Sequence, residues 1–88
     1  MDHKEEEAHD KTVVLIVNLE KKSWSEEKIA YEQVIHLAFP HPPDGIVITY
    51  TVEYERGPAQ NPEGSLTKGH VVYVKKGMVF NVTETGRS

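Results

Sequence analysis

The chain contains no cysteine, and this absence excludes several classes of protein at once. Disulfide-stapled secreted scaffolds, zinc sites with thiolate ligands and cysteine nucleophiles all need that residue. Aromatic residues are also scarce, at 8% of 88 residues, and hydrophobic residues reach only 38%. A chain of this length and composition predicts one small domain whose core is just large enough to fold alone.

An excess of basic residues is absent as well, because the formal net charge is −4. The first ten residues, MDHKEEEAHD, hold five acidic residues against one lysine, so the remainder of the chain is electrically balanced. Nucleic-acid binders need a basic stripe, and we therefore expect no nucleic-acid partner. We interpret residues 1–11 as a disordered acidic leader.

Long apolar runs and catalytic signatures are missing too. No stretch reaches the roughly 18–20 apolar residues of a membrane span, and the N-terminus lacks the apolar core of a signal peptide. The sequence thus predicts no membrane association and a cytoplasmic location. It has no Gly-x-Ser-x-Gly, P-loop or dinucleotide motif, and its five histidines lack metal-ligand spacing. We expect no catalytic residue, no metal and no cofactor.

The patterns that are present predict strands around one helix. Five consecutive aliphatic residues, 13–17, indicate a strand over Val13–Leu19 that is apolar on both faces and central in its sheet, and KKSWSEE completes a hairpin over residues 10–27. The stretch KIAYEQVIHLAFP has helical spacing over about residues 29–39, and PHPPDG ends it. His36 then lies near the carboxyl end of the helix, where a cation is favourable.

Three further strands are expected. IVITYTVEYERG alternates cleanly over residues 46–57, residues 58–69 form a loop, and HVVYV and MVFNVT follow around a KKG turn. The order β-β-α-β-β-β predicts an α+β domain, a mixed sheet with the helix packed on one face. We expect the last strand to run parallel to the first, and Leu37 and Phe80 to lie buried between helix and sheet.

Several segments together resemble a known family: YEQVIHLAFP, YTVEYERG, EGSL, KGH and KKGMVFNVT. As a set they resemble the bacterial multiubiquitin family of ubiquitin-like domains, over about residues 12–88. The resemblance implies a ubiquitin-like β-grasp fold and a non-catalytic protein modifier. It also implies three partners, namely an activating enzyme, a conjugating enzyme and a peptidase that trims the modifier. The chain departs from ubiquitin in lacking a Gly-Gly end and in holding one copy of the domain.

The last residues are the first candidate site. The strand pattern stops at Thr83, so we expect a domain over residues 12–83 and a flexible, exposed tail over residues 84–88. An activating enzyme needs a slim, extended chain beside the reacting carboxylate, and glycine has no Cβ. Gly86, Arg87 and Ser88 are therefore the candidate processing and attachment end. The alternative is an ordinary frayed terminus.

The outer face of the sheet is the second candidate site. Period-2 alternation sends four apolar side chains away from the helix: Val14, Ile16, Tyr73 and Val79. An exposed apolar patch of this kind is a protein-binding surface. Two alternatives are that another segment covers the face, or that a one-residue slip in register exchanges the two faces.

Three functions remain open at the level of sequence. The first is a ubiquitin-like modifier whose tail is processed and conjugated. The second is a ubiquitin-like binding module that uses the outer sheet face and has an inert tail. The third is a sulfur carrier on the same fold, but that chemistry needs a Gly-Gly carboxylate, which the chain lacks.

Overall fold

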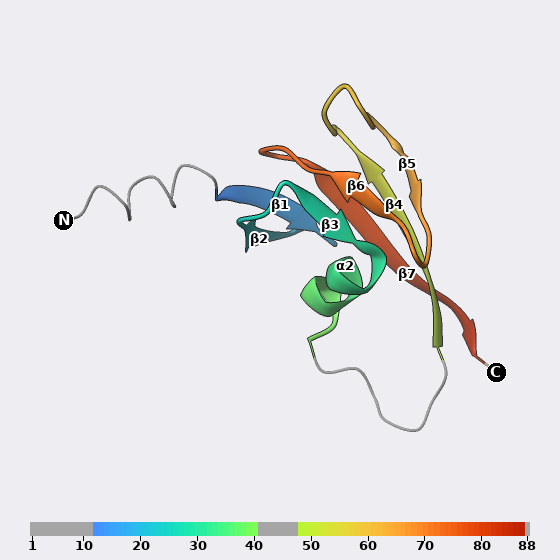
Figure 1. The fold of residues 1–88 in the computed structure, drawn as a ribbon. Coiled ribbons are helices and arrows are strands. Elements are labelled where there is room, and N and C mark those ends of the chain that lie inside the picture. The colour runs from blue at the N-terminus through green and yellow to red at the C-terminus, as the bar shows by residue number, and fades with distance from the viewer. Residues whose placement is uncertain (1–11, 41–47, 88) are drawn as a thin grey trace.

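The computed structural model describes residues 12–40 and 48–87, in which a large sheet is overlaid on one face by a helix and a small sheet (Figure 1). No helix among these residues is long and apolar enough to cross a membrane. The elements in chain order are β1 (Val13–Val17), β2 (Glu20–Trp24), β3 (Lys28–Ala30), α2 (Tyr31–Ala38), β4 (Ile48–Glu55), β5 (Gly64–Leu66), β6 (Val71–Tyr73) and β7 (Val79–Arg87).

The large sheet has five strands in the order β2-β1-β7-β4-β5. β1 and β7 run parallel, and every other neighbouring pair is antiparallel, which confirms the mixed sheet with parallel first and last strands. The predicted hairpin is β1 and β2. β1 lies inside the sheet as expected, but the middle position belongs to β7, which pairs with β1 on one side and β4 on the other.

Two strands escaped prediction because each has only three residues. β3 lies where the helix was expected to begin, and it pairs with β6 as a separate two-stranded sheet. The helix therefore starts at Tyr31, two residues late, with the Gln33 side chain accepting a hydrogen bond from the Ala30 N–H at 2.7 Å. β5 lies in the predicted loop, where Leu66 pairs with Val52 and is buried.

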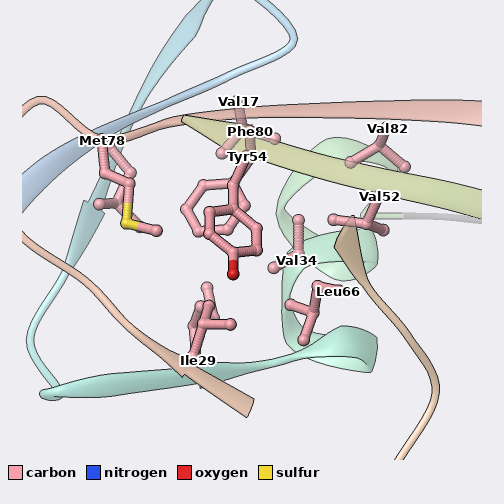
Figure 2. Packing of buried hydrophobic residues seen from close by; sticks show 11 residues of the cluster. Val17, Ile29, Val34, Val52, Tyr54, Leu66, Met78, Phe80 and Val82 are labelled. Atoms are coloured by element: carbon pink, nitrogen blue, oxygen red, sulfur yellow. The ribbon is translucent and has the colours of Figure 1, made fainter. Parts of the chain in front are cut away.

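The core fills the space between the inner face of the large sheet, the helix and the small sheet (Figure 2). Phe80 is fully buried, as predicted, and its ring lies 6.1 Å from that of Tyr54. Leu37 was wrongly predicted to be buried, since it is only half-buried at the core margin. The helix is two turns long, and Val34, in its middle, is its buried residue.

Two asparagine side chains each make two hydrogen bonds with the backbone of one strand residue. The amide group of the side chain takes the place of a peptide group of a neighbouring strand. Asn18 accepts a hydrogen bond from the Val82 N–H at 2.8 Å and donates one to the Val82 carbonyl at 3.1 Å. Asn61 makes the same double contact with Tyr73 on β6, at 2.8 and 2.9 Å. Asn18 thereby extends the β1–β7 pairing beyond the end of β1, and Asn61 occupies an edge of the small sheet.

The turn between β1 and β2 places a leucine in an unfavourable backbone conformation. Asn18 and Leu19 have φ values of 51° and 71°, as in the two-residue turns that match the twist of a hairpin. Asparagine tolerates this conformation, whereas for a leucine it is unfavourable by roughly 1–2 kcal/mol. Leu19 is 89% exposed, so burial of its side chain does not offset the unfavourable conformation.

We therefore expect Leu19→Gly to stabilise the domain by roughly 0.5–1 kcal/mol, because glycine removes the steric penalty and loses only part of the gain to greater freedom when unfolded. The measurement is the urea midpoint at constant slope. Leu19→Ala is the matched control: it keeps the Cβ, so its midpoint should stay near that of the unmodified protein. A lower midpoint for the glycine variant would show that the leucine side chain contributes to the fold.

Candidate functional site

Residues 84–87 are held in a strand rather than hanging free. β7 continues to Arg87, and the pairs Tyr50↔Glu84, Thr49↔Gly86 and Ile48↔Arg87 join it to the start of β4. The prediction that the strand stops at Thr83 is therefore wrong, because residues 84–87 are paired with β4. The flexibility expected of residues 84–88 stays a prediction. Ser88 lies outside the described residues, as does the predicted leader, residues 1–11.

We call this part of the molecule the terminal ribbon: residues 48–50 of β4 with residues 84–87 of β7. The register shifts between Thr49 and Tyr50, so Thr85 has no partner residue and forms a bulge. The Thr85 hydroxyl donates a hydrogen bond to the Thr49 carbonyl at 3.0 Å. Glu84 and Thr85 are exposed, as predicted, so these two side chains bury little surface against β4.

The sequence missed this pairing because nothing apolar follows Thr83, and strand prediction rests on apolar alternation. The contacts that join residues 84–87 to β4 are backbone pairs and the Thr85 hydroxyl, and such contacts leave almost no trace in a single sequence. One signal was present in the threonines at 49, 51, 83 and 85, a residue type enriched in strands.

The outer face of the large sheet carries three of the four apolar residues predicted there. Val14 is 40% exposed, and Ile16 and Val79 are half-buried. Ile16 and Val79 are partners across the parallel β1–β7 pairing, so the three side chains form one apolar outer patch. Its neighbours on β2 are polar: Ser23 pairs with Val14, and Lys21 pairs with Ile16.

Tyr73 does not belong to this patch. It lies on β6, which is part of the small sheet on the helix side of the molecule (Figure 1). Its ring is 37% exposed and lies 5.3 Å from the Lys28 ammonium, while Asn61 holds its backbone. The prediction assigned β6 to the large sheet. A strand of three residues is too short for its sequence to indicate the strand with which it pairs.

Leu19 is a surface residue that the sequence did not indicate. It was predicted to be part of the first strand, but it forms the turn beyond β1 and is 89% exposed. Asn18, which precedes it, was the available signal, because asparagine favours turns with positive φ.

Two hollows on the surface lie apart from the predicted sites. One is lined by Val13, Ser25, Glu26, Glu27, Lys28 and Val74. A shallower one is lined by Glu53, Tyr54, Glu55, Glu63, Gly64, Ser65 and Asn81. Over residues 12–40 and 48–87 no three histidine, aspartate or glutamate side chains gather as a metal site would require. His3, His9 and His41 lie outside the described residues.

A mixed five-stranded sheet with parallel first and last strands and a helix on one face defines a ubiquitin-like β-grasp domain. The sequence model of the Multiubiquitin family matches residues 13–86, and the chain belongs to that family. Domains of this family are ubiquitin-like and typically non-catalytic, and they work through protein partners. No curated protein and no solved structure matches the chain.

Proposed function

We propose that this domain is a bacterial ubiquitin-like protein modifier whose end, at Gly86, Arg87 and Ser88, is processed and conjugated. The observation that carries the proposal is the path of β7. The strand crosses the middle of the sheet through Phe80 and Val82 and then runs on to Arg87, beyond the core. The fold thus anchors the strand firmly and delivers its end, as an extended chain, outside the packed domain.

The last residues suit a narrow enzyme channel. Glu84 and Thr85 are exposed and Gly86 has no side chain, so the final stretch brings little bulk near the reacting group. The family match also ends at Gly86. We infer that a peptidase hydrolyses the Gly86–Arg87 bond, adding one water and leaving the Gly86 carboxylate and a free amino group on Arg87.

The carboxylate then becomes an acyl donor. On the activating enzyme a Gly86 carboxylate oxygen attacks the α-phosphorus of ATP, and pyrophosphate leaves. An enzyme nucleophile attacks the acyl carbon, loses its proton and displaces AMP, and the acyl group is then carried to the conjugating enzyme. In the last step a nucleophile on the acceptor bonds to the acyl carbon and gives up a proton, and the conjugating enzyme's nucleophile leaves with a proton. Every catalytic group belongs to the partner enzymes, and this domain supplies the carboxylate and the surface they recognise.

Adduct formation with the host's activating and conjugating enzymes tests the proposal. Deletion of Gly86, Arg87 and Ser88 should abolish adducts, while costing about 1 kcal/mol or less of stability, since only two strand pairs are lost. Deletion of Arg87 and Ser88 should keep or increase adducts, because the Gly86 carboxylate is then already exposed. Gly86→Val should slow transfer about tenfold or more, because a branched Cβ crowds the acyl carbon.

Unchanged adduct formation after deletion of all three residues would overturn the proposal. In that case the second candidate applies, a ubiquitin-like binding module with an inert end. The observation favouring it is the apolar outer patch of Val14, Ile16 and Val79, which lies on a face where alternation otherwise places polar residues. A protein partner would bury this patch.

A further inference from the structure

The outer end of β7 makes fewer contacts with the sheet than its inner part does. β1 pairs with β7 at Val79 and Phe80, and Asn18 extends that contact to Val82. Beyond Val82, β4 is the one strand among the described residues that pairs with β7. The start of β4 and the end of β7 run on side by side (Figure 1). The β4 strand is held there at Tyr50, whose carbonyl accepts a hydrogen bond from the Tyr31 hydroxyl at 3.2 Å and whose ring stacks on Phe39 at 5.4 Å.

The bulge at Thr85 divides the outer two pairs of the terminal ribbon from the continuous pairing. From Tyr50↔Glu84 inwards to Glu55↔Val79 the register is unbroken, whereas the pairs at Gly86 and Arg87 lie beyond Thr85. Short segments with exposed side chains open without unfolding the domain. Residues 84–87 can therefore detach from β4 while Phe80 and Val82 stay buried in the core.

Pairing with β4 also conflicts with use of the same residues by an enzyme. A channel that accepts an extended chain must surround it, and a strand partner occupies one edge of that chain. The Thr85 hydroxyl, bonded to the Thr49 carbonyl, fastens the segment at the bulge. The processing bond and the reactive end are thus covered on one side whenever the ribbon is closed.

We propose that residues 84–87 alternate between a closed state, paired with β4, and an open state, and that only the open state is accepted by the processing peptidase and the activating enzyme. Thr85 is the residue that sets the balance between the two states. This inference rests on the proposed function, and it adds to that function a built-in restraint on when the end can be used.

A disulfide lock tests the restraint, because the chain has no cysteine of its own. Ile48→Cys with Arg87→Cys joins two residues that are partners across the ribbon, at a separation that suits a disulfide. Thr51→Cys with Thr83→Cys is the matched control, because it joins the same two strands on the inner side of the bulge and leaves residues 84–87 free to open. Each variant is compared with its own reduced form, so the substitutions themselves cancel.

Two readouts are needed. The first is cleavage of the Glu84–Thr85 bond by a glutamate-specific endoprotease, followed by intact mass after reduction. Oxidation of the outer pair should slow this cleavage about tenfold or more, and oxidation of the inner pair should change it less than about twofold, since cleavage follows the open population. The second is trimming and adduct formation with the host enzymes, for which we expect the same contrast.

Thr85→Val provides a test in the opposite direction. The variant keeps the branched shape but removes the hydrogen bond to Thr49, so cleavage after Glu84 should rise about two- to tenfold. Thr83→Val, on the same strand within the unbroken register, is its control. This variant keeps the inference testable if the outer cysteine pair fails to fold.

The outcomes separate the two proposals. Equal cleavage after Glu84 in the oxidised and reduced outer-pair variant, or no rise for Thr85→Val, would show that the closed state does not protect the end. Slowed cleavage with unchanged trimming and adduct formation would show that opening is not required. If the unmodified protein is neither trimmed nor joined to an acceptor, the proposed function fails and the restraint on processing falls with it.

Discussion

Replacement of Phe80 by alanine is expected to destabilise the domain by roughly 3–5 kcal/mol, the range for truncating a fully buried phenylalanine. Phe80 is 0% exposed, lies on the middle strand of the sheet and packs against the ring of Tyr54. Figure 2 shows it in the midst of side chains from the large sheet, the helix and β3. Little can move in to fill the space, because strands enclose β7 on both sides.

A domain of this size has roughly 5–10 kcal/mol of stability in total, so Phe80→Ala should remove a large share of it. Urea unfolding at 25 °C measures the effect. Val79→Ala is the control: it changes the adjacent residue on the outer face, where the side chain is half-buried, and should cost about 1 kcal/mol. A larger loss for Val79→Ala would mean that the two faces of β7 are exchanged, and equal losses would show that Phe80 is not the better buried of the two.

Gly57→Ala should be the second most damaging substitution, at roughly 2–4 kcal/mol, because it combines a steric clash with the loss of hydrogen bonds. A Cβ at this position would overlap the carbonyl oxygen of Asn61 and lie 3.0 Å from the Met78 Cε. The Gly57 N–H also bonds to the Pro62 carbonyl at 2.9 Å, so the loop cannot move away freely. If the loop does move, Asn61 loses its double contact with Tyr73 on β6.

Two controls isolate the cause in the same thermal or urea measurement. Asn61→Ala removes the contact with Tyr73 without a clash and should cost about 1–2 kcal/mol. Gly69→Ala adds a Cβ where no atom lies within 4 Å but φ is 87°, and should also cost about 1–2 kcal/mol. A Gly57→Ala loss no larger than either control would show that the loop adjusts easily.

The central features of the fold were predictable because they depend on burial. An aliphatic run apolar on both faces identified β1 as an interior strand, and alternation along β7 identified Phe80 as a core residue. The single helical stripe, with a proline-rich stop, gave one helix on one face. Together these features, with the family resemblance, were enough to identify a ubiquitin-like β-grasp domain.

What could not be predicted depends on pairing between short segments. β3 and β5 have three residues each, and a pattern of three residues does not distinguish strand from loop or helix start. Tyr73 was assigned to the wrong sheet for the same reason. Leu37 was predicted to be buried from its spacing alone, whereas its burial depends on how far the helix reaches over the sheet.

For the candidate sites, the sequence indicated which residues share a face of the sheet, but not which strand lies beside residues 84–87. Val14, Ile16 and Val79 were grouped correctly because period-2 alternation carries directly into the sheet. The contact between residues 84–87 and β4 was missed, since backbone pairing leaves little mark in the side-chain pattern beyond the threonines of both strands. The prediction of an attachment end at Gly86, Arg87 and Ser88 still stands as a prediction.

The position of the last strand at the middle of the sheet has a consequence for biosynthesis. A ribosome releases β1 and β2 first, and they can form a hairpin at once, but β1 must wait for β7 before its other edge is paired. The Asn18–Val82 contact spans 64 positions of the chain, and such distant contacts make folding slow. During translation the nascent chain therefore carries an open, aliphatic strand edge until residues 79–82 emerge, and this interval is when the domain is most exposed to aggregation and to chaperones.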